Sequence, residues 1–271
     1  MKKIDYFKEI IIFLLIILTY FPTFIWMIDR WKAADSYYSH GFLIPFISGF
    51  IAWHNLRKLS GFRIIPVFRW GWLLLIMGTG IHVISALLRV HFTSAYSLLL
   101  VLSGLILLFG GKEYFKKMLF PILFLTFMIP LPLFLTSNLS FRLKILASQM
   151  AVAIVNMTGV KAVIDGSVII TAHSQLIVED PCSGIRSLIA LIALSFLFAY
   201  YSKITKRGKI ILCFASVPIA ICANVVRIVM LTLVGEIYGA RFTTGLFHEI
   251  MGFGVFVLAF LGLSILLKVL K

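Results

Sequence analysis

Long apolar runs dominate the pattern of hydrophobic and polar positions along the chain. A helix needs about 20 apolar residues to cross the hydrocarbon core of a bilayer. Runs of that length predict eight membrane-spanning helices, at residues 8–28, 37–54, 70–88, 94–110, 118–136, 184–202, 210–234 and 249–268. The first run follows "MKKIDYFK", is too long for a signal-peptide core and lacks a small-residue cleavage site, so we interpret it as a retained signal anchor.

Residues 139–157 are apolar but do not suit a ninth span. They carry Arg142 and Lys144 near one end and Gln149 and Asn156 further on. A crossing at this point would also invert every later loop. We therefore expect an interfacial or partly embedded helix.

A hairpin is predicted next, because β-branched runs lie on both sides of Asp165-Gly166. Its second arm, residues 167–178, leads towards Cys182. An open hairpin cannot lie in hydrocarbon with unpaired edge groups, so we expect it at the outer surface, over the cysteine. The predicted fold is thus an all-α polytopic membrane protein, a single domain over residues 1–271 with an extracytoplasmic insertion at 139–183.

Composition supports a membrane protein and sets its orientation. The 271 residues are 61% hydrophobic and 13% charged, with a mean hydropathy of +1.07. The net charge of +15 lies in short basic clusters between apolar runs, which leaves no basic face for nucleic acid. Sixteen of the 25 basic residues fall on the side of the two termini: Lys2, Lys3, Lys8, Arg57, Lys58, Arg63, Arg69, Lys112, Lys116, Lys117, Lys203, Lys206, Arg207, Lys209, Lys268 and Lys271. We therefore expect the protein to lie in a cell's inner membrane, with both termini in the cytoplasm.

Cys182 lies in "VEDPCSGIRSLIAL", at the outer mouth of the sixth predicted span. Unpaired N–H groups and the dipole at a helix N-terminus favour a thiolate, which makes Cys182 a candidate nucleophile. Glu179 and Asp180 oppose ionisation of the thiol, so a nearby cation is required. Cys213 and Cys222 have apolar neighbours within the seventh predicted span and are expected to be small buried hydrophobic residues.

Arg227 is the best candidate for that cation, because it lies inside the seventh predicted span, in "CANVVRIVMLTLVG". A charged residue within a span indicates a functional site and needs a partner. Asn224 is three residues earlier and shares its helix face. The alternative is a structural arginine paired with an acid such as Glu179, Asp180 or Glu236.

His248, in "GLFHEIMGFG" at the start of the eighth predicted span, is a candidate for moving protons at neutral pH. The alternative is a structural hydrogen bond. No metal is expected, because a glycine stands where the second histidine of a zinc-protease motif belongs. Arg186, one turn after Cys182, is suited to assist the thiolate or to bind a substrate carboxylate, or else is an ordinary interfacial arginine.

At these residues the sequence resembles the exosortase and archaeosortase family of membrane-embedded cysteine transpeptidases. The matching motifs are "PCSGIRSL", "ANVVRIV" and "FHEIMGF", together with "YYSHGFLIPFIS" at residues 37–48 and "FMIPLPLF" at 127–134. The resemblance implies an acyl-enzyme at Cys182, with Arg227 and His248 as the other two catalytic positions. The histidine favours the bacterial exosortase branch.

The implied substrates are exported proteins with a C-terminal sorting signal, made of a short motif, a membrane helix and a basic tail.

The backbone N–H groups of Ser183 and Gly184 are suited to bind the oxyanion. His40, in "YYSHGFLIP", belongs to an aromatic belt or contributes to the site. The prolines of "MIPLPLF" are expected to kink or end the fifth span. No cofactor is implied.

Two other classes of protein fit part of this pattern. A transporter or lipid flippase needs many spans and an intramembrane charge, but it predicts polar or broken segments near the bilayer midplane, whereas the polar residues here gather at one face. A non-catalytic assembly partner in envelope or polysaccharide export would tolerate the loss of Cys182. Neither the acceptor of the transfer step nor the oligomeric state follows from the residues.

Overall fold

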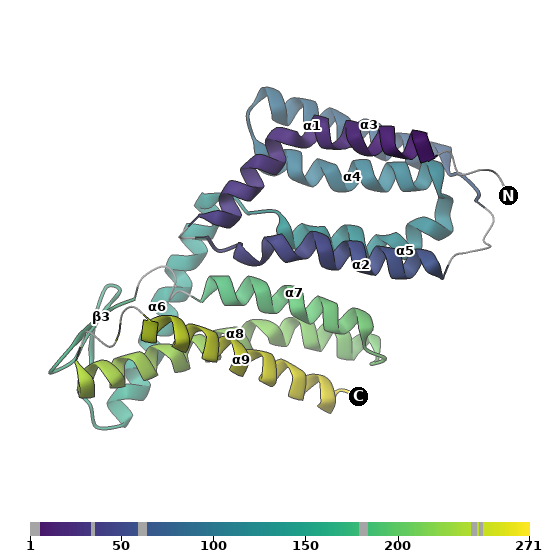
Figure 1. Ribbon diagram of the computed structural model, residues 1–271. Coiled ribbons are helices and arrows are strands. Elements are labelled where there is room, and N and C mark those ends of the chain that lie inside the picture. Colours follow the sequence, from purple (N-terminus) through teal and green to yellow (C-terminus); the bar gives the residue numbers. More distant parts are fainter. Residues whose placement is uncertain (1–5, 34–35, 59–63, 179–183, 240–242, 244–245) are drawn as a thin grey trace. The chain divides into compact units, whose positions relative to one another are not determined.

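A computed structural model describes residues 6–33, 36–58, 64–178, 184–239, 243 and 246–271, without the side chains of Tyr6, Lys8, Glu9 and residues 246–249. The chain forms two compact units, Met1–Leu131 (unit 1) and Pro132–Lys271 (unit 2) (Figure 1). The folding of the whole chain as one domain stays a prediction.

The described part of unit 1 is helical. Its described elements are α1 (Tyr6–Lys32), the 3-10 helix η1 (Ser39–Phe42), α2 (Leu43–Arg57), α3 (Phe68–Leu87), α4 (His91–Phe109), α5 (Gly111–Phe124) and the 3-10 helix η2 (Leu125–Met128). Helices α3 and α4 pack closely through small residues: a Cβ atom added at Gly78 would lie 2.9 Å from Cγ2 of Val101. One added at Gly104 would lie 2.8 Å from the carbonyl oxygen of Gly71. Glycine at these positions lets the two backbones approach, as is common between membrane helices.

Several buried polar groups of unit 1 are paired between helices. The hydroxyls of Tyr20 and Ser97 are 2.9 Å apart, and those of Thr23 and Ser94 are 2.7 Å apart. The Nδ1 atom of His82 lies 2.9 Å from the Ser94 hydroxyl. These contacts join α1, α3 and α4, because a polar group inside an apolar bundle gains most from a partner on a neighbouring helix.

Unit 2 has four α-helices and a small sheet among its described residues. These are α6 (Leu133–Met157), β1 (Val163–Asp165), β2 (Val168–Ile170), β3 (Gln175–Ile177), α7 (Ile185–Tyr201), α8 (Lys206–Tyr238) and α9 (Leu246–Val269). Helix α8 packs against the other three helices. The inner face of the sheet joins the core through Ile169, Leu176 and Val178, which pack with Val225 and Ile228 of α8.

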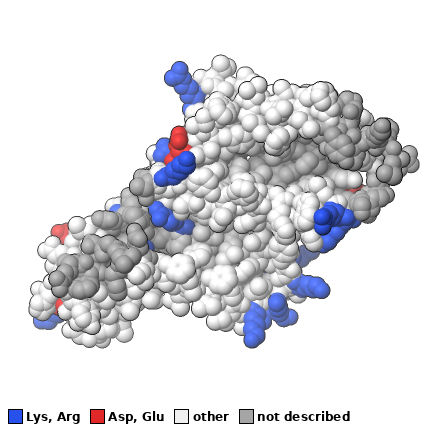
Figure 2. Space-filling model, in the orientation of Figure 1, with Lys and Arg blue, Asp and Glu red and all other residues white. Residues whose placement is uncertain are grey.

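Six helices of the described residues are long and apolar enough to cross a membrane, which makes this a multi-pass membrane protein. They are α1, α3, α4, α6, α8 and α9, so the predicted number of eight spans is not confirmed. Helices α2 and α5 have 15 and 14 residues, which is short of a bilayer core about 30 Å thick. Helix α7 is apolar but has 17 residues, so it is shorter than the six candidate spans. Figure 2 shows a largely uncharged surface with Lys and Arg side chains in small groups, as expected for helices that face lipid.

The predicted fifth span, residues 118–136, is not one helix. The chain leaves η2 at Met128 and starts α6 at Leu133, with Pro130 and Pro132 between. Proline has no N–H to donate to the carbonyl four residues earlier, so the helix ends here, as predicted from "MIPLPLF". The segment predicted as an interfacial helix, residues 139–157, is the continuation of α6, whose 25 residues meet the length and hydropathy of a span.

The predicted hairpin at Asp165-Gly166 is present but belongs to a larger sheet. Strands β1, β2 and β3 pair antiparallel in that order. The second arm, predicted as one strand over residues 167–178, is folded back at Thr171–Ser174, where the Thr171 N–H donates to the Ser174 carbonyl over 2.9 Å. This turn contains neither glycine nor proline, and the sequence pattern therefore did not mark it.

Candidate active site

Cys182 and Ser183 lie outside the described residues, as do Glu179 and Asp180. The chain on both sides of them is described. Before them, Val178 is buried and its N–H donates to the Ser167 carbonyl over 2.9 Å. The thiolate assignment and the oxyanion assignment to the Ser183 N–H thus stay predictions.

Gly184 resumes the described chain two residues after Cys182, as the N-cap of α7. Its φ of +78° is a left-handed conformation that favours glycine. A Cβ atom here would lie 2.7 Å from Cγ of Asn224, so the Asn224 side chain rests on the Gly184 backbone. Asn224 is itself 3% exposed. The motif that contains the cysteine therefore contacts the motif "ANVVRIV" at this point.

Arg227 lies on α8, one turn after Asn224 and on the same face. Its side chain is 9% exposed, and its guanidinium lies against α9: a Cβ atom added at Gly252 would be 3.2 Å from Nη2 and 3.4 Å from Cζ. Gly252 is four residues after His248, so the two positions share one face of α9. The side chain of His248 is outside the description, but its helix face is the one that meets Arg227.

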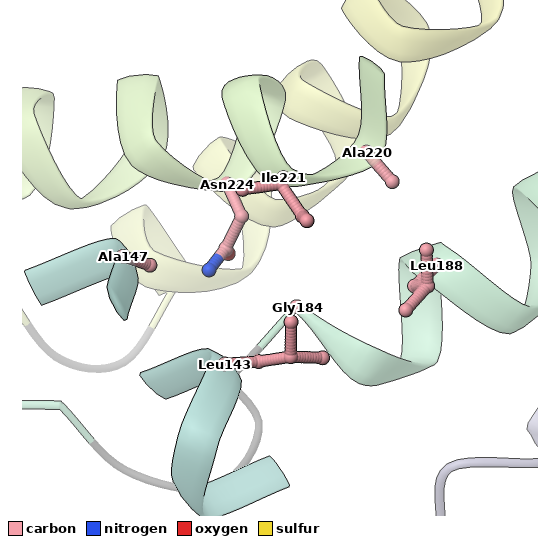
Figure 3. A pocket seen from close by; sticks show the side chains of 7 residues that line it. All are labelled: Leu143, Ala147, Gly184, Leu188, Ala220, Ile221 and Asn224. Atoms are coloured by element: carbon pink, nitrogen blue, oxygen red, sulfur yellow. The ribbon is translucent and has the colours of Figure 1, made fainter. Parts of the chain in front are cut away.

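A small cavity lies beside Asn224 (Figure 3). Its lining comes from α6 (Leu143, Ala147), the start of α7 (Gly184, Leu188) and α8 (Ala220, Ile221, Asn224). The volume is about 10 Å³, which is enough for about one water molecule. Figure 3 shows the Asn224 amide directed into this space, where it is the polar side chain of an otherwise apolar lining.

Arg186 is in the first turn of α7 and is half-buried. Ser187, next to it, donates its hydroxyl to the Gly184 carbonyl over 2.9 Å and so stabilises the start of the helix. That Arg186 assists the thiolate or binds a substrate carboxylate stays a prediction.

Glu236 has partners that sequence reasoning did not identify. The N–H of His173 donates to Oε2 over 3.0 Å, and Nδ1 of His173 lies 2.8 Å from Oε1. Glu236 is nine residues after Arg227, about 14 Å along the helix axis. The contacts with His173 therefore argue against Glu236 as the partner of a structural Arg227. His173 is 63 residues away in sequence, so no local pattern could have indicated the pair.

His40 lies in unit 1, in η1, and its ring stacks on Tyr38 at a centroid distance of 5.9 Å. Nearby, the Trp31 indole donates to the Met128 carbonyl over 2.9 Å. Pro132 has no N–H for that carbonyl, so the indole replaces a helical hydrogen bond. The Tyr38 hydroxyl also forms a hydrogen bond with the backbone of Leu131. The "YYSHGFLIP" and "MIPLP" motifs thus meet in unit 1, while a contribution of His40 to the site stays a prediction.

The other two cysteines lie on α8, as expected. Cys213 is half-buried, but Cys222 is exposed, so the prediction that both are buried is wrong for Cys222. Its position faces outward from a membrane helix, where lipid accepts a small apolar thiol. No group of three His, Cys, Asp or Glu side chains within the described part of the chain is placed to hold a metal.

The structure has six candidate spans among its described residues, and in unit 2 a buried Arg227 rests on Gly252 while a buried Asn224 rests on Gly184. These features define a multi-pass membrane protein with a polar centre in unit 2. Residues 31–265 match the transmembrane exosortase family. The chain belongs to this family, which supports a membrane exosortase-type function. Neither the curated proteins nor the solved structures contain a match.

Proposed function

We propose that this protein is a membrane cysteine transpeptidase of the bacterial exosortase branch, which cleaves C-terminal sorting signals of exported proteins. One observation carries the proposal. In unit 2, Asn224 rests on Gly184 and Arg227 rests on Gly252, so one turn of α8 touches the segment next to Cys182 and the helix face of His248. Three motifs that are far apart in sequence thus meet around one buried cation.

Cys182 is the proposed nucleophile. Its thiolate sulfur attacks the carbonyl carbon of the scissile peptide bond and forms a tetrahedral oxyanion. The C–N bond then breaks, the departing amine takes a proton, and the new N-terminal product remains as a thioester on the sulfur. An acceptor nucleophile, either an amine or water, attacks the thioester and releases the thiol.

Arg227 is proposed to stabilise negative charge in this sequence. A guanidinium in a nearly dry site acts more strongly on a thiolate or an oxyanion than it would in water. The N–H of Gly184 is a second candidate donor to the oxyanion. His248 is proposed to hold the proton that the departing amine requires, since imidazole exchanges protons near neutral pH.

The substrate class follows from the membrane setting. A signal made of a short motif, an apolar helix and a basic tail presents its scissile bond where the helix leaves the bilayer. We propose that the termini of the enzyme lie in the cytoplasm and the site on the outer side of the inner membrane, because the basic loops favour that orientation. The same rule retains the basic tail of the substrate in the cytoplasm.

The first test is processing in cells of a tagged reporter that carries the C-terminal signal of an exported protein from the same organism. Wild-type enzyme, Cys182→Ala and Cys222→Ala are compared at matched levels. We expect cleavage by the wild type and Cys222→Ala but not by Cys182→Ala. A reporter-linked thioester, released by hydroxylamine, should accumulate on the wild-type enzyme when the acceptor is limiting.

Equal cleavage of the reporter by wild type and Cys182→Ala would contradict the nucleophile assignment. The remaining alternatives would then be that this family member acts as a transporter, a lipid flippase or an assembly partner in envelope export. Normal export in Cys182→Ala, without any reporter cleavage by the wild type, would favour those alternatives directly.

A further inference from the structure

Strand β3 is an edge of the small sheet in unit 2. The order is β1-β2-β3, so β3 pairs with β2 on one side. Among the residues that the structure describes, no strand pairs with its other side. Edge strands present unpaired N–H and C=O groups, and such edges accept another strand readily.

The register of the sheet shows which groups of β3 point outward. Residues that exchange hydrogen bonds alternate along an antiparallel pair with residues that do not. The residues that flank β3 bond to the residues that flank β2: Thr171 N–H donates to the Ser174 carbonyl, and Val178 N–H donates to the Ser167 carbonyl, both over 2.9 Å. Gln175 and Ile177 are the alternate residues, so their N–H and C=O groups point away from β2. Both residues are exposed, and Ile177 is 61% exposed.

The edge is firmly held. Leu176 and Val178 are 5% and 1% exposed and pack against α8. The turn before β3 is attached to the end of α8 by the two contacts between His173 and Glu236. An edge with a fixed backbone gives an incoming strand a defined register.

The edge also leads into the candidate active site. Cys182 is five residues after Ile177, a distance of about 18 Å at most along the chain. On the far side of the cysteine, Gly184 is held by Asn224 of α8, the helix that also anchors β3. Both ends of the intervening segment therefore rest on the same helix.

We propose that the outer edge of β3 binds the extended segment of the sorting signal as an added strand, next to Cys182. This inference rests on the proposed function. The four outward backbone groups of Gln175 and Ile177 complement the backbone of an extended peptide and demand no particular side chain. A peptide that has just left a membrane helix has unpaired backbone groups of its own, so pairing satisfies both chains.

Strand β1 is the matched negative control. Its outer edge presents the backbone of Ile164, by the same alternation of the register. The chain before β1 turns back to α6, where the Asn156 amide bonds to both backbone groups of Ala162 at 2.8 and 3.1 Å. This edge does not lead to the cysteine.

Proline at position 177 removes the outward N–H without removing a hydrogen bond of the sheet. We expect Ile177→Pro to raise the KM for reporter cleavage about tenfold, the effect of one lost hydrogen bond of about 1.4 kcal/mol. Ile177→Thr keeps the N–H and should stay near wild type, as should Ile164→Pro. Equal KM values for Ile177→Pro and Ile177→Thr, at matched protein levels, would overturn the proposal.

Binding can be measured without chemistry in the Cys182→Ala enzyme. A photo-crosslinking amino acid at Ile177 should capture the tagged reporter, whereas the same group at Val163, on β1 and 65% exposed, should not. If the crosslinker at position 177 captures the reporter but cleavage of the reporter does not depend on Cys182, the proposed function is refuted and the strand site is retained. Cleavage that depends on Cys182, with no capture at 177 or equal capture at 163, would refute the strand site alone.

Discussion

The two units contain different kinds of buried polar groups. In unit 1 several are hydroxyls and an imidazole that pair with one another between helices, such as Tyr20 with Ser97, and the buried Ser48 and Asn55 donate to backbone carbonyls of α5. In unit 2 they include a buried arginine and an amide that rest on glycine backbones of neighbouring elements. The first arrangement stabilises a bundle, since its groups satisfy each other. The second holds a charge in an apolar setting, which is costly and is typical of a functional site.

The largest expected effect is loss of the Arg227 charge. We expect Arg227→Gln to lower the rate of reporter cleavage at least about 100-fold, since removing one donor to an oxyanion costs that much in other enzymes. Arg227→Lys keeps the charge and should retain part of the activity. A polar change in unit 1, Ser97→Ala, should leave the cleavage rate near wild type. Similar losses in Arg227→Gln and Ser97→Ala would break the comparison.

Gly184→Ala should have the next largest effect. It places a side chain at φ +78° and at 2.7 Å from Cγ of Asn224, so the start of α7 must move. We expect about a tenfold loss of cleavage, from a left-handed conformation that costs about 1–2 kcal/mol plus the clash. Gly166→Ala is the control, because φ is +57° there but no atom lies within 4 Å of the added Cβ. Activity assays that show equal losses would exclude a specific effect of the Asn224 contact.

In unit 1, Trp31→Phe should affect stability rather than chemistry. It leaves the Met128 carbonyl without the indole donor, and Met128 is 4% exposed. An unsatisfied buried acceptor costs about 1–3 kcal/mol. Thermal unfolding in detergent should show this loss, while the cleavage rate of the folded protein should change by less than about twofold. An unchanged melting temperature would show that the carbonyl finds another donor.

The smallest effect is expected for the pair Tyr20 and Ser97. A double-mutant cycle with Tyr20→Phe and Ser97→Ala should give a coupling of about 0.5–1.5 kcal/mol in the free energy of unfolding. The cleavage rate should be the same in all four proteins. Coupling near zero would mean that the 2.9 Å contact contributes no net stability.

Sequence reasoning located most helices well, because apolar runs of this length have few alternatives in a membrane. The predicted span 70–88 is α3 (Phe68–Leu87), and 94–110 is α4 (His91–Phe109). It was less successful where short-range patterns compete. An apolar run across Pro130 and Pro132 resembles a span by hydropathy, although proline ends the helix there.

The membrane class, the family and the candidate residues Cys182, Arg227 and His248 were determined by the sequence itself, since hydropathy and motif order are properties of the chain alone. Only the tertiary structure decided that Asn224 lies on Gly184, that Arg227 lies on Gly252, and that Glu236 is held by His173. Such contacts join residues tens of positions apart. They depend on how closely whole helices approach one another, which no local pattern of side chains records.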